Sequence, residues 1–258
     1  MTENPDGGAL TSDHLLGGRV KYLQPRDGLR ATLDPVLLAA AIPARPGDRV
    51  LEGGAGAGAA LLCLAARLPG PGGLGIEGLG IDRDPALLCL ARANAAANGW
   101  PNLMFAAADL AACPAADGRF DHAFANPPYH PADGSPSPSH ARDAAKRVAP
   151  DLLRVWVEAL SRPLRHRGTL TLILPPRLLE GALTAMRAAH VPGECVFPVW
   201  PKAGSPARFI LLRGRKNGRA PLLLAAGLVL HTDFGTFRPE AEAILRGGAA
   251  LPLNGNGA

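Results

Sequence analysis

Short apolar runs alternate along the chain with longer segments rich in alanine and leucine. This alternation is typical of a βαβ chain and predicts an α/β fold with a largely parallel sheet. The apolar runs predict strands near residues 49–53, 76–82, 102–106, 120–125, 168–174, 194–199, 207–213 and 227–232. The longer segments predict helices over residues 58–68, 85–98, 150–162, 176–190 and 239–246.

Two Asp-Pro pairs and two irregular stretches add detail to this pattern. Asp34-Pro35 and Asp84-Pro85 each join an N-cap residue type to a proline at the first helical position, so a further helix is expected from Asp34 to about Ile42. Residues 69–80 contain a short internal echo and predict a loop insertion before a strand. Residues 131–140, rich in proline and serine, predict a mobile loop.

The composition indicates a folded chain of ordinary size. The 258 residues, 47% of them hydrophobic, can bury a sizeable core. The longest apolar runs fall short of the roughly 18 to 20 residues needed to span a bilayer. The start of the chain lacks a basic stretch followed by an apolar one, and the four cysteines show no close pairing. We therefore expect no membrane span and a reducing, cytoplasmic location.

Charge is distributed unevenly along the chain. Residues 1–139 carry 10 Lys and Arg against 14 Asp and Glu, whereas residues 140–258 carry 17 against 8, so the halves have net charges of −4 and +9. A basic second half favours an anionic partner such as RNA. Because 23 of the 27 cations are Arg in a chain rich in Ala, Gly and Pro, biased codon usage is an alternative explanation.

A glycine-rich turn follows the first predicted strand of the main sheet. Gly54, Gly56 and Gly58 carry no side chains, so a ligand can lie against the backbone at the carboxyl end of that strand. The spacing is G-x-G-x-G, which differs from the dinucleotide fingerprint, and no Lys-Ser or Lys-Thr follows to form a P-loop. Glu52 at the strand end favours a neutral or cationic ligand over a pyrophosphate.

Two acidic positions follow the next two predicted strands. Asp82 ends the second strand just before a helix, where a carboxylate can accept hydrogen bonds from both hydroxyls of a ribose. Glu77 is an alternative for this role because the internal echo places it in an equivalent position, but Asp82 is preferred because it directly precedes the helix start at Asp84-Pro85. Asp109, in the loop after the third strand, can accept a bond from the amino group of an adenine, although a loop Asp is more often a turn or cap residue.

The fourth strand ends in Asn126-Pro127-Pro128-Tyr129. Two prolines cannot continue a central strand, and they hold the backbone stiffly enough for the Asn126 amide and the Pro127 carbonyl to point the same way. Two such acceptors suit an NH₂ group whose lone pair must be freed for attack. Tyr129 supplies a ring on which a flat substrate can stack.

The order of these motifs resembles the class I S-adenosylmethionine-dependent methyltransferases that act on planar amino or amide nitrogens. Softer matches extend the resemblance to bacterial tRNA adenine-N6 methyltransferases that modify position 37 of a valine tRNA. These matches are Gln24-Pro25, Gly28, Arg30, Asp34 and Leu37-Leu38-Ala39 near the start, and Leu230-His231, Gly235, Phe237 and Glu240 near the end.

The resemblance implies a fold, a division of the chain and a reaction. The fold would be a Rossmann-like, mostly parallel seven-stranded sheet with helices on both faces and an antiparallel edge. Residues 1–46 would form an N-terminal lid and helix, and residues 47–258 the methyltransferase domain, within a single globular domain overall. The reaction would be methyl transfer from S-adenosyl-L-methionine to an exocyclic adenine nitrogen of a tRNA partner.

The resemblance also assigns roles to the candidate residues. The cofactor would be held by Glu52, Gly54, Gly56, Gly58, Asp82 and Asp109, with Glu52 near its ammonium group. The acceptor nitrogen would be held by Asn126, Pro127 and Tyr129. Further substrate contacts are expected from Pro128, Arg30 and Arg142.

Three rival functions stay open at this point. Methylation of a glutamine side chain in a release factor or ribosomal protein uses the same Asn-Pro-Pro-Tyr motif, and only the basic second half and the terminal matches favour RNA. A nicotinamide-dependent oxidoreductase is opposed by the glycine spacing. A non-catalytic RNA-binding module is opposed by the full set of cofactor and acceptor residues. The histidine spacings match no common metal site, so no metal is expected.

Overall fold

The computed structural model describes residues 10–26, 31–68, 75–128 and 152–253. Its centre is a nine-stranded sheet in the order β10-β8-β9-β7-β6-β3-β4-β5, with β11 also paired to β8. The longer strands are β3 (Arg49–Gly53), β4 (Glu77–Asp82), β5 (Leu103–Ala107), β6 (Phe120–Ala125), β7 (Leu164–Leu174), β8 (Gly193–Trp200) and β9 (Phe209–Arg215). Two-residue strands, β10 (Leu223–Leu224) and β11 (Leu228–Val229), extend the β8 edge.

The predicted fold class is confirmed. Strand β9 runs antiparallel to both β7 and β8, while the other pairings of this sheet are parallel in the described part of the chain. Seven of the eight strands expected from the apolar runs are the seven longer ones, and β10 is an addition. The strand expected over residues 227–232 is reduced to β11, because the chain beyond Leu230 leaves the sheet to form a turn.

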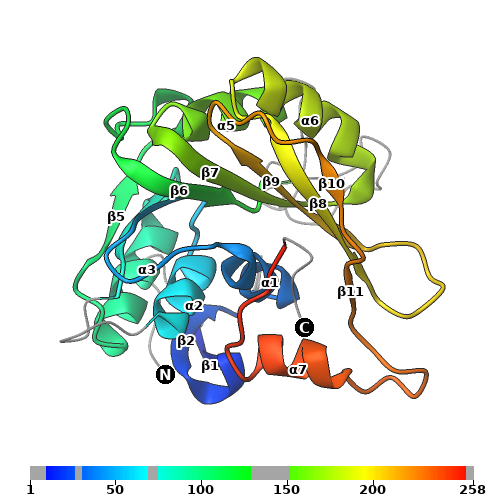
Figure 1. The fold of residues 1–258 in the computed structure, drawn as a ribbon. Helices are drawn as coiled ribbons and strands as arrows, with labels where there is room; N and C mark the ends of the chain where they lie inside the picture. Colours follow the sequence, from blue (N-terminus) through cyan, green and yellow to red (C-terminus); the bar gives the residue numbers. More distant parts are fainter. Residues whose placement is uncertain (1–9, 27–30, 69–74, 129–151, 254–258) are drawn as a thin grey trace, which may run out of the picture.

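Helices cover both faces of the sheet (Figure 1). One face carries α1 (Leu33–Ala41), α2 (Ala59–Arg67), α3 (Pro85–Ala97) and α7 (Pro239–Leu245), and the other carries α5 (Leu152–Ser161) and α6 (Leu179–Ala188). Two separate apolar cores result, one on each face, as expected for a buried parallel sheet. None of the helices within the described ranges is long and apolar enough to cross a membrane.

The two Asp-Pro pairs behave differently. Asp84 caps α3 as expected, because its carboxylate accepts the N–H groups of Ala86 (2.9 Å) and Leu87 (3.3 Å). The expected N-cap at Asp34 is wrong: α1 begins at Leu33, so the N-cap is Thr32 and Asp34 lies in the first helical turn. An acidic side chain in that turn still interacts favourably with the helix dipole.

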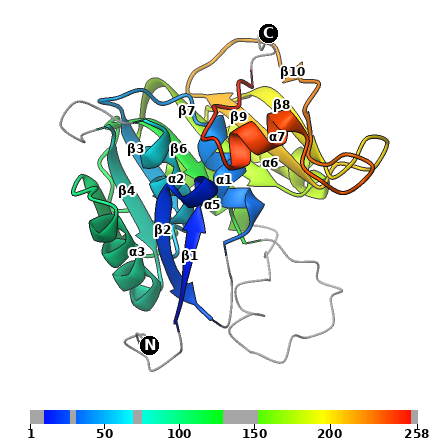
Figure 2. The same cartoon turned by 90° about the horizontal axis from the view of Figure 1, so that it is seen from below.

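A hairpin that the apolar pattern did not predict precedes α1. Strands β1 (Leu10–Leu15) and β2 (Val20–Pro25) pair antiparallel and lie against α3 and α2, as the view from below shows (Figure 2). The inward positions of β2 are buried, including the polar Gln24. A single alternating run of six residues with one polar inward position is a weak strand signal, so only its packing against α3 identifies it.

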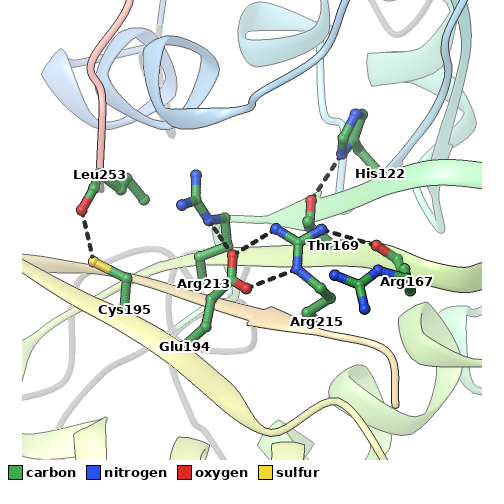
Figure 3. A network of polar contacts seen from close by, with 8 residues as sticks. All are labelled: His122, Arg167, Thr169, Glu194, Cys195, Arg213, Arg215 and Leu253. Carbon is green, nitrogen blue, oxygen red and sulfur yellow. Dashed lines mark hydrogen bonds and ion pairs between the residues drawn. The ribbon is translucent and has the colours of Figure 1, made fainter. Parts of the chain in front are cut away.

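The basic second half of the chain is partly neutralised inside the sheet. The Glu194 carboxylate accepts bonds from Arg213 Nε (2.8 Å) and Arg215 Nε (2.8 Å), and Arg213 is only 3% exposed (Figure 3). These residues lie where β8 begins and β9 ends. Arg213 and Arg215 therefore pair with an acid between strands. They are not free to attract an anionic partner, so the basic surface of the second half is smaller than its net charge suggests.

The hairpin is fastened to α3 by two asparagines that make matching bonds. Buried Asn94 accepts the N–H of Leu23 (2.7 Å) and donates to the carbonyls of Leu23 (2.9 Å) and Ala57 (3.1 Å). Asn98, nearer the surface, accepts from and donates to the backbone of exposed Lys21 at 2.9 and 2.8 Å.

We expect Asn94→Ala to lower the free energy of unfolding by about 3 kcal/mol, because it leaves buried backbone groups without partners. Asn98→Ala should cost less than about 1 kcal/mol, since water replaces its bonds. Urea denaturation of both variants measures the difference. Equal losses for the two variants would contradict the burial argument.

Candidate active site at the carboxyl edge of the sheet

Strand register brings the predicted site residues to one edge of the sheet. Gly53, the last residue of β3, pairs with Ala125 of β6 on one side and Ile81 of β4 on the other. The next residues of the two flanking strands are Asn126 and Asp82. They therefore flank the glycine turn, about two strand spacings or roughly 10 Å apart. Open α/β sheets place their ligands at this edge.

The glycine turn adopts backbone angles that favour glycine at all three predicted positions. The φ angles of Gly54, Gly56 and Gly58 are 69°, 53° and 88°. A Cβ at Gly54 would lie 2.6 Å from the Trp156 ring, and one at Gly58 would press on Ala91 and Phe105 at 3.3 Å. Only at Gly56 does the side-chain direction lead into open space. Gly56 is thus the position where a ligand can approach the turn most closely.

Asp82 holds the glycine turn in place. One carboxylate oxygen accepts the N–H of Gly56 (2.8 Å), and the other accepts the N–H of Asp84 (2.9 Å). Each carboxylate oxygen has a second lone pair, so the group retains capacity for two more donors such as ribose hydroxyls. Glu77, the alternative to Asp82, is the first residue of β4 and lies at the opposite end of that strand. Its carboxylate pairs with Arg49 Nε (2.7 Å).

Glu52 is a buried acid whose carboxylate lies at the start of α2. It is 4% exposed, and its Oε2 accepts the N–H of Leu61 (3.1 Å). Burial raises the pKa of Glu52 well above its usual range; the Leu61 bond opposes this shift, and nearby Asp82 adds to it. A buried carboxyl in this state gains most from a cationic group placed beside it.

Asn126 carries an unsatisfied acceptor. Its side-chain Oδ1 is buried and has no hydrogen-bond partner among the residues that the structure describes. Pro127 beside it is buried and Pro128 half-buried, and neither has an N–H to offer. A buried acceptor without a partner costs about 1 to 3 kcal/mol, and such groups are rare outside functional sites. The arrangement is ready to receive a donor such as an NH₂ group.

The remaining predicted residues are less well defined. Asp109 is exposed and caps a 3₁₀ turn, η3 (Leu110–Ala112), by accepting the N–H of Ala111 (2.8 Å). Capping alone is a sufficient structural role for Asp109. Because Asp109 follows β5, it also lies at the carboxyl ends of the parallel strands, where the other site residues are. Tyr129, Arg30 and Arg142 lie outside the described residues, as do residues 131–140.

Two aromatic residues near the site were not assigned to it from the sequence. Trp156 of α5 packs against Gly54 and forms one wall of the turn. Tyr22 of β2 is buried close enough to Glu52 for the carboxylate charge to raise the pKa of its hydroxyl, after the larger effect of burial. From the sequence alone, Trp156 is either a core residue or a cleft-wall residue. Tyr22 had no signal because its hairpin was not predicted.

A hollow of about 340 Å³ lies away from these residues. Its lining includes Arg19, Leu68, Trp100 and Leu103. It lies near the beginnings of β4 and β5 and contains none of the predicted acceptors or acids. The chemistry of the described residues therefore points to the carboxyl edge and not to this hollow.

Comparisons with known proteins agree with the fold. Residues 50–151 match the family model described as "Methyltransferase domain". The chain is 30% identical over 194 residues to the tRNA1(Val) (adenine(37)-N6)-methyltransferase of Actinobacillus succinogenes, covering 74% of this chain and 79% of that one. The enzyme of the same name from Aeromonas salmonicida is 30% identical over 220 residues, covering 82% and 86%.

A solved structure supports the same architecture. It is described as a predicted O-methyltransferase from Agrobacterium tumefaciens and superimposes with a TM-score of 0.70 at 24% identity. The superposition covers 86% of this chain and 99% of the other. At this level of identity the likeness establishes the fold alone.

The buried Glu52 makes stability depend on pH. Because its pKa is raised on folding from the usual 4.5, the stabilisation it gives is fully present below that value and is lost as pH rises through the raised pKa. Glu52→Gln is neutral at every pH and can still accept the Leu61 bond. Measured by urea denaturation from about pH 4.5 to about pH 8, the variant should gain stability relative to wild type. Parallel pH profiles for the two proteins would refute the assignment.

Proposed function

Because the chain belongs to the tRNA1(Val) (adenine(37)-N6)-methyltransferase family, we propose that it transfers a methyl group to the exocyclic N6 of an adenine in tRNA. The methyl donor is S-adenosyl-L-methionine, in keeping with the methyltransferase domain and fold. The reaction class is that of an N-methyltransferase. The relatives' names supply the tRNA substrate, and the position of the adenine within the tRNA belongs to the proposal.

The observation that carries the proposal is the orphaned acceptor on Asn126. An adenine N6 is an NH₂ group that donates two hydrogen bonds. Asn126 Oδ1 would accept one, and we assign the second to the Pro127 carbonyl. Holding both hydrogens in this way directs the nitrogen lone pair out of the ring plane and stabilises the positive charge that develops as the new bond forms. The proton then leaves to water.

The residues around the glycine turn fit the cofactor. The open space above Gly56 accommodates the methionine part of the cofactor. Buried Glu52 supplies a negative partner for its ammonium group, and the Asp82 carboxylate has free lone pairs for two ribose hydroxyls. When bound, S-adenosyl-L-methionine supplies a methyl group that its sulfonium already activates. The chain's own task is therefore placement of the nitrogen, which needs no acid or base of tuned pKa.

Several further assignments complete the proposal. We assign Gly54 and Gly58 to the cofactor turn, Asp109 to the adenine end of the cofactor, and Tyr129 to stacking with the target base. Pro128, Arg30 and Arg142 are proposed substrate contacts. Residues 1–46 are proposed to act as a lid on residues 47–258, and a cytoplasmic location is proposed with the tRNA substrate.

The substrate class is tested by transfer of radiolabelled methyl from S-adenosyl-L-methionine into unmodified total tRNA. A release factor serves as the parallel acceptor, and the labelled RNA is digested for nucleoside analysis. Label in N6-methyladenosine is the expected result. Label in the protein alone would move the function to glutamine methylation, and label in neither would reject the proposed activity.

Replacing Asn126 tests the acceptor site. Asn126→Ala should lower kcat for tRNA methylation at least about 100-fold, as loss of a preorganised hydrogen-bonding group does in other enzymes. Cofactor affinity, measured by calorimetry, should stay nearly unchanged because Asn126 is assigned only to the acceptor. Normal turnover by this variant would show that the acceptor assignment is wrong.

Replacing Asp82 tests the cofactor site. Asp82→Ala removes the acceptor for the Gly56 N–H as well as the proposed ribose contacts, so the Kd for S-adenosyl-L-methionine should rise on the order of 10- to 100-fold. Glu77→Ala is the matched control, since Glu77 lies at the other end of the same strand, and its cofactor Kd should equal that of wild type. Weaker binding in Glu77→Ala alone would reverse the assignment.

A further inference from the structure

An exposed aromatic residue stands at the tip of a turn between β11 and α7. Phe234 is 96% exposed, the highest value among the large hydrophobic residues that the structure describes as exposed. Burying an aromatic ring of this size gains substantial free energy, so a partner that covers the Phe234 ring would gain affinity from it. Phe234 is not among the residues of the candidate active site.

The turn holds Phe234 outward by its own hydrogen bonds. The N–H of Thr232 donates to the carbonyl of Thr236 (2.8 Å), the N–H of Gly235 donates to the carbonyl of Thr232 (3.0 Å), and the two threonine hydroxyls lie 2.8 Å apart. Gly235 supplies the left-handed backbone angle, φ 86°. The ring therefore projects from an ordered turn, and a partner that binds it need not order the backbone first.

The base of the turn is anchored to the neighbouring loop between β8 and β9. The rings of His231 and Phe237 stack with centroids 4.8 Å apart, and His231 Nδ1 lies 2.9 Å from the carbonyl of Pro201. Lys202 Nζ donates to the carbonyl of Asp233 at 3.3 Å. Both loops extend from the same side of the molecule in Figure 1, and they overlap in Figure 2.

The two loops together carry a net positive charge. Residues 201–208 and 231–238 contain Lys202, Arg208 and Arg238 against the single acid Asp233, so three cations and one anion give a net charge of +2. All three cations are exposed. Arg238 also lies 4.0 Å from Glu240, and Arg208 lies over the Phe209 ring at 5.2 Å.

The turn lies at the same edge of the sheet as the candidate active site. Strand β8 runs parallel with β6 and β3, because both it and β7 are antiparallel to β9. The loop of residues 201–208 follows the carboxyl end of β8, and the Phe234 turn follows β11, which pairs with β8 on the side away from β9. The end of β11 is four strand spacings from the end of β6, or roughly 19 Å. A nucleic acid with one base at Asn126 can therefore present another nucleotide to the turn.

We propose that the Phe234 turn binds an unpaired nucleotide of the RNA substrate by stacking, with Lys202, Arg208 and Arg238 contacting adjacent phosphates. This inference rests on the proposed tRNA substrate. A single aromatic ring among cations is typical of single-stranded nucleic-acid contacts. A protein partner would instead favour a continuous apolar patch, and the other large exposed hydrophobics in the described ranges lie elsewhere, on β5 and at or next to β10.

The test measures the Kd of the full chain for fluorescently labelled, unmodified tRNA by anisotropy. Phe234→Ala should raise this Kd about 5- to 100-fold, the range expected for loss of one base stack, while kcat at saturating tRNA stays close to that of wild type. Phe234→Trp should bind as tightly as wild type and show added indole quenching when tRNA binds. Phe234→Leu, apolar but without a π face, should bind as weakly as Phe234→Ala.

Two controls separate the alternatives. Met104→Ala, which removes a 64% exposed apolar side chain on β5, should leave the tRNA Kd unchanged. Sedimentation of wild type and Phe234→Ala should show the same oligomeric state. A leucine variant that binds as wild type does, or an alanine variant that changes only self-association, would overturn the inference.

Failure of the inference is distinct from failure of the proposed function. If wild type methylates tRNA and Phe234→Ala binds it equally well, only the stacking role is refuted. If wild type methylates a release factor and not tRNA, the tRNA substrate itself is rejected and the stacking role is rejected with it.

Discussion

The hydrogen bond from the Gly56 N–H to the Asp82 carboxylate is the contact on which the site depends most directly. It joins the glycine turn after β3 to the end of β4, and it fixes the one bare position in the turn that faces open space. The parallel register of β3 with β4 and β6 makes this contact possible, because it brings three strand ends to one level. The acceptor residue Asn126 gains its position from the same register.

The same region stores unfavourable interactions that a ligand would relieve. Glu52 is buried at the start of α2 with one backbone donor on its Oε2, and Asn126 Oδ1 is buried without a partner in the described structure. Each arrangement costs free energy on folding. A ligand with a cation near Glu52 and an NH₂ group near Asn126 would offset both costs. The site therefore favours a ligand that has both groups.

The periphery of the site is assembled from segments distant in sequence. Asn94 of α3 bonds both the hairpin strand β2 and Ala57 of the glycine turn, so the N-terminal hairpin and the turn share one anchor. At the other end of the same sheet edge, the loop after β8 and the turn before α7 are joined through Lys202 and His231. The cations of the second half differ in their environment. Arg213 and Arg215 pair with Glu194 inside the fold, whereas Lys202, Arg208 and Arg238 are exposed.

The sequence by itself determined the α/β class, the seven longer strands, the start of α3 at Asp84 and the order of motifs, because periodicity, caps and turns are local properties. It favoured Asp82 over Glu77 because Asp82 directly precedes the helix start at Asp84-Pro85, but the echo kept Glu77 as an alternative. The structure places the two residues at opposite ends of β4. The sequence left Trp156 open as a core or cleft-wall residue, and it missed the β1–β2 hairpin and the orphaned state of Asn126 Oδ1. These features arise when distant segments pack together, and burial and hydrogen-bond satisfaction are properties of that packing that no local pattern encodes.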